Sequence, residues 1–117
     1  MSITIYHNPR CSKSRQTLEL IESSGVSPKI VEYLTAPPDA DTLLRISALL
    51  EIPLADLLRR GESEFSNAGD TVPLDDKEAL AAWIVANPKV LERPIVVDEE
   101  KGRAIVGRPP ENVLSLL

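Results

Sequence analysis

The chain has a single cysteine and a single histidine, Cys11 and His7, which lie four positions apart. Three basic side chains, Arg10, Lys13 and Arg15, stand beside them. Positive neighbours stabilise a thiolate relative to a thiol, and the thiolate is the nucleophilic form of cysteine. A lone cysteine is often only a small buried apolar side chain, but these basic neighbours favour a reactive thiol.

The thiol of Cys11 needs only a moderate stabilisation of its ionised form to react near neutral pH. An unperturbed thiol, with a pKa of about 8.5, is only a few per cent ionised there. Lowering this pKa by about two units takes roughly 2.7 kcal/mol. One cation at about 4 Å supplies that much or more before the cost of desolvation is subtracted.

His7 can act on this thiol in two ways. A protonated imidazole would stabilise the thiolate, and a neutral one could accept the thiol proton. The residue types do not choose between these roles, and a polar residue that merely ends a strand is the simpler alternative. One cysteine and one histidine are too few for a typical metal site, so we expect no metal.

The neighbouring segments predict that Cys11 lies at a turn from a strand to a helix. Residues 3–6 are β-branched and aromatic, as in a strand, whereas Leu18, Leu20 and Ile21 have helical spacing. At the start of a helix, unpaired N–H groups and the positive end of the helix dipole favour a thiolate and also a bound anion.

The remaining segments are expected to follow in a recognisable order. The sequence predicts a strand at 29–34, a helix from Asp39 to about residue 50 and a short helix from Pro53. A mobile loop at 61–73 and a helix from a capping box at 75–78 to Asn87 are expected next. Hairpin strands at 94–97 and 103–106 and a helix from Pro109 complete the order. This order predicts an α/β, thioredoxin-like fold with a central mixed four-stranded sheet. A helical insertion at about 38–88 would separate the βαβ and ββα halves of a single domain, 1–117.

Composition agrees with one soluble domain. The chain has 117 residues, of which 43% are apolar and 26% are charged. The net charge of −5 counts against general nucleic-acid binding, and no apolar run approaches the roughly 20 residues that cross a bilayer. We expect a cytoplasmic monomer that binds neither nucleic acid nor a membrane. Its lone cysteine makes any redox chemistry depend on a thiol from another molecule.

The residues after Cys11 exclude two common types of cysteine chemistry. A phosphatase-type loop would place an arginine at position 17, where the chain has Thr17. A two-cysteine disulfide oxidoreductase would place its second cysteine at position 14, which is Ser14.

Residues 7–15, HNPRCSKSR, resemble the HNPxCxxSR signature of the glutaredoxin- and glutathione-dependent arsenate reductase family, the ArsC family. Later segments resemble further motifs of that family in the same order, namely Leu57-Leu58-Arg59, Asn87-Pro88, residues 92–97 and residues 107–111. The closest likeness is to a short branch of arsenate reductase-like proteins.

The resemblance implies roles for individual residues. It implies that Cys11 is the nucleophile, with His7, Ser14 and Arg15 as further catalytic residues. Ser14 would donate a hydrogen bond to the thiolate, and Arg15 would help to set the local charge. Pro94 resembles the cis-proline of thioredoxin-like folds.

The resemblance also implies that Arg59, Arg93 and Arg108 hold an oxyanion, although Arg60 could replace Arg59. Arg93 and Arg108 each precede a proline, at the entry of one hairpin strand and the exit of the next. An antiparallel hairpin would bring these two guanidinium groups to the same edge. Guanidinium groups can bind a tetrahedral oxyanion through paired hydrogen bonds.

The activity implied by the family is the reduction of arsenate to arsenite. Glutathione would be a co-substrate, glutaredoxin would resolve the mixed disulfide, and no cofactor would be bound. One alternative is a regulatory module like the Spx-type proteins, which contact RNA polymerase; these usually have a second cysteine, where this chain has Ser14. Another is a thiol-dependent enzyme with a different substrate.

Overall fold

The computed structural model describes residues 2–92 and 94–117. These residues form two compact units. The first contains residues 2–36 and 94–117, and the second, Pro37–Glu92, closely matches the helical insertion expected at about 38–88. The prediction of a single domain stays a prediction.

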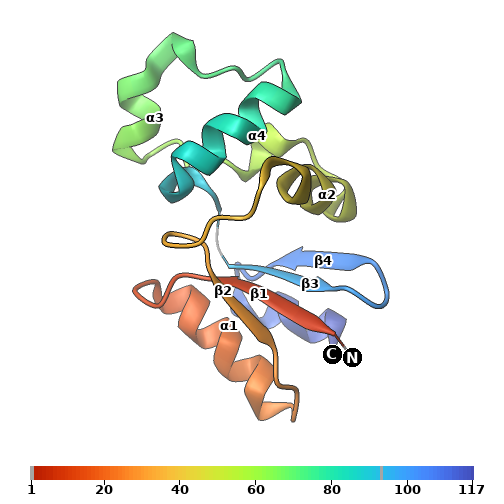
Figure 1. Cartoon of the computed structure of the whole chain (residues 1–117). Coiled ribbons are helices and arrows are strands. Elements are labelled where there is room, and N and C mark those ends of the chain that lie inside the picture. Colours follow the sequence, from red (N-terminus) through yellow and green to blue (C-terminus); the bar gives the residue numbers. More distant parts are fainter. Residues whose placement is uncertain (1, 93) are drawn as a thin grey trace. The chain divides into compact units, whose positions relative to one another are not determined.

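The first unit is built on a four-stranded sheet, visible in Figure 1. Its strands are β1 (Ile3–His7), β2 (Lys29–Glu32), β3 (Ile95–Asp98) and β4 (Arg103–Val106), in the order β2-β1-β3-β4. Strand β1 pairs in parallel with β2 and antiparallel with β3, and β3 and β4 form an antiparallel pair. The predicted mixed sheet is therefore confirmed.

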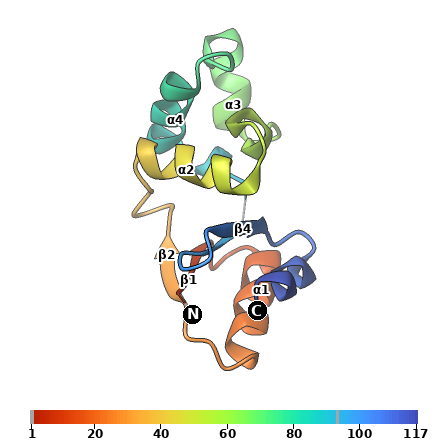
Figure 2. The same ribbon diagram turned by 90° about the vertical axis from the view of Figure 1, so that its right-hand side faces the viewer.

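Two helical segments, α1 (Ser12–Ser23) and the 3-10 helix η4 (Pro110–Leu116), pack together and cover one face of this sheet (Figures 1 and 2). Ile3 and Ile5 lie on the same side of β1 because strand side chains alternate. They form an apolar core with Ile21 of α1 and with residues of β3 and η4. This core attaches α1, and with it Cys11, to the sheet.

The second unit consists of helices. They are α2 (Ala40–Leu50), η1 (Leu54–Leu57), α3 (Ser63–Ala68), η2 (Gly69–Thr71), α4 (Lys77–Ala86) and η3 (Pro88–Val90), of which the η segments are 3-10 helices. Helix α2 packs against α4. Their buried side chains include Leu43 and Ile46 from α2 and Leu80 and Ile84 from α4. No helix among the described residues is long and apolar enough to cross a membrane.

The mobile loop predicted at 61–73 is wrong, because this stretch contains α3 and η2. Helix α3 buries none of its residues, so it has no apolar stripe that a sequence pattern could detect. Its Phe65 instead contacts Trp83 of α4 edge to face, with ring centroids 6.5 Å apart. One aromatic contact of this kind leaves no periodic signal.

Two aspartates cap the longer helices of the second unit. As predicted, Asp39 caps α2, accepting a hydrogen bond from the Thr42 N–H at 2.8 Å, and this bond lowers the pKa of the Asp39 carboxyl. The capping box expected to start at Asp75 is shifted by one residue. Asp76 is the cap of α4 and accepts from the Ala79 N–H at 3.1 Å.

Candidate active site

Cys11 is the residue that directly precedes α1, as the sequence predicted. Its backbone is extended, its N–H donates to the Asn8 carbonyl at 3.0 Å, and its carbonyl accepts from the Arg15 N–H at 3.0 Å. The side chain is half-buried, and the first turn of α1 contains no acidic residue. The thiol therefore lies at the positive end of a helix dipole with no nearby carboxylate in that turn.

Asn8 shapes the loop in front of Cys11 and was not identified from the sequence. It is buried, its Oδ1 accepts from the Arg10 N–H at 3.0 Å, and its own N–H donates to Ser14 Oγ at 3.1 Å. With the bond from the Cys11 N–H, these contacts hold both ends of the turn. The signal available was an asparagine before a proline, a combination that favours turn initiation.

His7 is buried at the end of β1, and its Nδ1 lies 2.6 Å from Ser14 Oγ. Desolvation by burial lowers the pKa of His7 below its ordinary value of 6.5. Glu32 and Glu22 oppose this shift, and Arg15 adds to it. A lowered pKa favours the neutral imidazole near pH 7, and the role of His7 toward the thiol stays a prediction.

Ser14 connects His7 to the loop. The hydroxyl has one proton. If the neutral His7 is unprotonated at Nδ1, the Ser14 hydroxyl donates its hydrogen bond to that nitrogen, while Ser14 Oγ accepts from the Asn8 N–H. The fully buried Ser14 thus stabilises the turn that carries Cys11. A hydrogen bond from the Ser14 hydroxyl to the Cys11 thiolate stays a prediction, and it requires the other tautomer, in which His7 Nδ1–H donates to Ser14 Oγ.

Arg15 also holds this turn. Its Nη1 donates to the Pro9 carbonyl at 3.0 Å, while its positive charge lies close enough to His7 to lower that residue's pKa. The expected effect of Arg15 on the charge around Cys11 stays a prediction.

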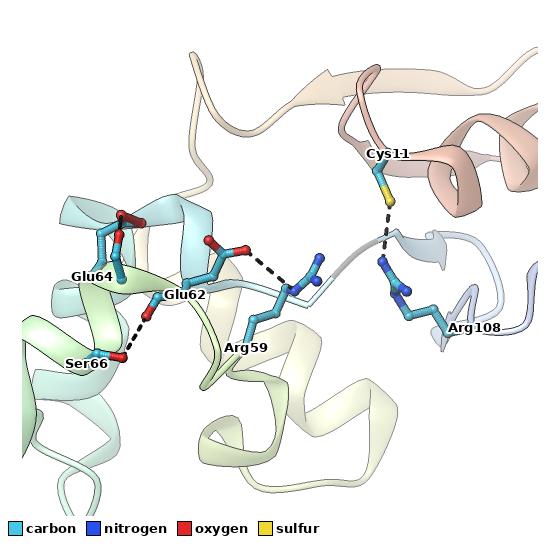
Figure 3. Close-up of polar contacts among 7 residues, drawn as sticks. Cys11, Arg59, Glu62, Glu64, Ser66 and Arg108 are labelled. Atoms are coloured by element: carbon cyan, nitrogen blue, oxygen red, sulfur yellow. Dashed lines mark hydrogen bonds and ion pairs between the residues drawn. The ribbon is translucent and has the colours of Figure 1, made fainter.

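Arg108 faces the thiol directly. Its Nη2 donates to Cys11 Sγ at 3.3 Å, and Figure 3 shows the guanidinium group pointing at the sulfur. Arg108 follows β4, and the two residues are separated by 97 positions in the sequence. A cation at this distance favours the thiolate over the thiol.

Arg59 and Arg60 lie in the second unit and have different surroundings. The guanidinium of Arg60 stacks over the Phe65 ring, 5.4 Å from its centroid. Arg59 Nε is 3.9 Å from Glu62 Oε1, an ion pair marked by a dashed line in Figure 3. Arg59 Nη1 is buried without a hydrogen-bond partner. Whether Arg59 or Arg60 contacts an anion stays a prediction.

Two expectations concern Arg93, which lies outside the described residues. They are its part in anion binding and the cis isomer of the Arg93–Pro94 bond. Within residues 2–92 and 94–117, the Arg108–Pro109 bond is cis. In the first unit the structure brings together His7, Cys11, Ser14, Arg15 and Arg108.

Among residues 2–92 and 94–117, no cluster of three or more His, Cys, Asp or Glu side chains could hold a metal ion.

The sheet order, with a cysteine at the start of α1, defines a thioredoxin-like fold. Residues 6–116 match the family model described as the ArsC family, and the chain belongs to that family. The resemblance read from residues 7–15 and the later motifs is thus confirmed.

Similar proteins cover nearly the whole chain. The uncharacterized protein YfgD of Escherichia coli K12 is 45% identical over 116 residues, which are 98% of this chain and 96% of that protein. The arsenate reductase of Neisseria meningitidis serogroup B is 41% identical over 116 residues, 98% of this chain and 97% of that protein. The solved structure of an arsenate reductase from Vibrio cholerae has a TM-score of 0.91 at 40% identity and covers 100% of this chain and 98% of its own.

Proposed function

We propose that this protein reduces arsenate to arsenite, with Cys11 as the nucleophile and with glutathione and glutaredoxin as external thiols. The observation that carries the proposal is the 3.3 Å contact between Arg108 Nη2 and Cys11 Sγ at the start of α1. One place thus has both a nucleophile and donors for an oxyanion. The similar proteins named arsenate reductase support the choice of substrate.

The proposed binding step uses positive charge that the chain provides around the sulfur. Arg108 would hold one arsenate oxygen beside Cys11, and the N–H groups of the first turn of α1 would stabilise negative charge. Arg59 is included in the proposed set because the family resemblance assigns it to the same anion. Arg93 completes the proposed binding set.

The proposed reaction moves two electrons from thiols to arsenic. The Cys11 thiolate attacks arsenic, and a hydroxyl leaves as water after taking up a proton. A glutathione thiolate then attacks the Cys11 sulfur. The sulfur–arsenic bond breaks, its electron pair stays on arsenic, and arsenite is released. A glutaredoxin thiolate attacks the glutathione sulfur of the Cys11–glutathione disulfide. Cys11 leaves as a thiolate, and the glutathione remains on glutaredoxin as a mixed disulfide, which a second glutathione reduces.

External thiols follow from the single cysteine, because a disulfide cannot be passed along this chain. The proposal accordingly includes a cytoplasmic location, where thiols are kept reduced. It also includes a monomer without a bound cofactor.

A coupled assay tests this function. Arsenate, glutathione, glutaredoxin, glutathione reductase and NADPH are mixed with the protein, and NADPH consumption and arsenite are both measured. We expect arsenate-dependent turnover that disappears in Cys11→Ser and falls about 10²-fold in Arg108→Gln, the usual effect of losing one charged donor at a reacting oxyanion.

The exposed Arg103 on β4 offers a matched control, because Arg103→Gln removes the same charge from the same hairpin. Turnover in this variant should equal that of the parent. Omitting glutathione or glutaredoxin in turn tests the thiol source. Absence of arsenite formation by the parent protein would reject arsenate as the substrate.

A further inference from the structure

The contact between Arg108 and Cys11 depends on how closely two distant segments approach each other. One is the start of α1, and the other is the connection between β4 and η4. These segments also meet at Thr17, in the second turn of α1, and at Gly107, the residue directly before Arg108. Thr17 and Gly107 are both buried.

Gly107 has no room for a side chain. A Cβ atom at this position would lie 2.6 Å from Thr17 Oγ1, 3.0 Å from Thr17 Cγ2 and 2.8 Å from Pro94 Cγ. Its backbone is outside the left-handed region, so an alanine would be costly because of these contacts and not because of its dihedral angles. By contrast, a Cβ on Gly61 would meet nothing within 4 Å.

Thr17 cannot easily move aside. It is fully buried, and its Oγ1 donates to the Lys13 carbonyl at 2.8 Å within α1. Rotating this β-branched side chain would break that bond and move a methyl group into a packed interior. The side chain therefore sets how near the backbone at Gly107 can come to α1.

The sheet holds Gly107 from the other side. The Gly107 N–H donates to the Pro94 carbonyl at 2.9 Å, just before β3. With α1 on one side and Pro94 on the other, a Cβ at position 107 could be accommodated only by displacing the connection. Arg108 is the next residue and would be displaced with it.

We propose that Gly107 is a positioning residue: its lack of a side chain lets the β4–η4 connection lie against Thr17, which places the Arg108 guanidinium on the Cys11 sulfur. The inference rests on the proposed function only in taking Cys11 as the nucleophile. It adds a residue that touches neither the sulfur nor the anion but controls the distance between the Arg108 guanidinium and the Cys11 sulfur.

The test measures the pH dependence of Cys11 alkylation by iodoacetamide, which needs no arsenate. A failure of the positioning role is therefore separate from a failure of the reductase function. Displacing Arg108 by about 1 Å weakens its interaction with the thiolate, so Gly107→Ala should raise the alkylation midpoint by about half a pH unit or more. Gly61→Ala should leave the midpoint unchanged.

Two further comparisons separate positioning from a general loss of structure. Because the effect of Gly107→Ala acts through Arg108, adding this substitution to Arg108→Gln should not raise the midpoint of Cys11 alkylation any further. Adding Thr17→Ala to Gly107→Ala should recover part of the shift, since the shortest contact is removed. A midpoint equal to that of the parent in Gly107→Ala, or an equal rise with and without Arg108, would overturn the proposal.

Circular dichroism of each variant shows whether it folds. If Gly107→Ala does not fold, the double variant carries the test, because its contact with Pro94 Cγ at 2.8 Å remains. Its midpoint must then exceed that of Thr17→Ala alone, and equal midpoints would reject the positioning role.

Discussion

Two kinds of group beside Cys11 favour the thiolate form of its sulfur over the thiol form. The dipole of α1 acts through the backbone and is present in any sequence that starts a helix at this position. The Arg108 guanidinium acts through one side chain, 3.3 Å from the sulfur. Because only the second contribution can be removed by substitution without changing the backbone, it is the one that can be measured.

Replacing Arg108 by glutamine should raise the midpoint of Cys11 alkylation by about one pH unit or more, because a neutral side chain loses the attraction to the thiolate. Arg108→Lys should cause a smaller rise, since the charge is kept but the planar donor group is lost. The measurement is iodoacetamide alkylation followed by mass spectrometry across pH.

Arg103→Gln is the control for a change in overall charge, since Arg103 is exposed at the other end of β4. Its midpoint should match that of the parent. A midpoint in Arg108→Gln that also matches the parent would show that the thiolate depends on the helix alone.

At the scale of elements, the start of α4 provides a direct test of the capping assignment. The Asp76 carboxylate accepts from the Ala79 N–H, so Asp76→Ala should lower the free energy of unfolding by about 0.5 to 2 kcal/mol. Urea unfolding of the purified protein measures this loss.

Asp75→Ala is the matched control, because it removes the same charge one residue earlier. We expect it to change the free energy of unfolding by less than about 0.5 kcal/mol. Equal losses in the two variants would mean that helix-dipole electrostatics, and not the cap, stabilises the start of α4.

The elements that could be predicted were those with a strong periodic or turn signal. Strands β1, β3 and β4 and helix α1 are of this kind, because β-branched runs, turn residues and helical spacing are local features of the sequence. Helix α3 is different. It buries no residue and is stabilised at Phe65 by an aromatic contact to another helix, so its sequence contains no stripe.

At the scale of the molecule, the buried His7 makes folding sensitive to acid. Its pKa in the folded state is lowered, so between that value and 6.5 the unfolded chain binds more protons. The contribution of His7 to the free energy of unfolding is therefore fully present above pH 6.5. It is lost as the pH falls towards the pKa of His7 in the folded protein. The slope cannot exceed about 1.4 kcal/mol per pH unit, because one proton is involved.

The measurement is the free energy of unfolding between pH 5.5 and 7.5, compared with His7→Gln. It is made in a Cys11→Ser background, since a stabilised thiolate would add a pH dependence of the same sign. His7 is the only histidine of the chain, so the slope should flatten in His7→Gln. An unchanged slope would assign the acid sensitivity to carboxylates.

The site could be predicted only in part, and the reason is distance along the chain. Residues 7–15 identified the thiol and its turn because these are local features. The Arg108 contact was expected only through family resemblance, since nothing local to Arg108 indicates its neighbour. The tight approach of Gly107 to Thr17 had no sequence signal, because a glycine before an arginine is equally compatible with an ordinary turn.

The 97 positions between Cys11 and Arg108 also have a consequence for the nascent protein. Translation at about 5 to 20 residues per second leaves roughly 5 to 20 s between the synthesis of the two residues. During that interval the whole of Pro37–Glu92 is made, and strand β1 still lacks β3. Cys11 on the ribosome is therefore without the Arg108 contact until β4 and the residues after it have been synthesised.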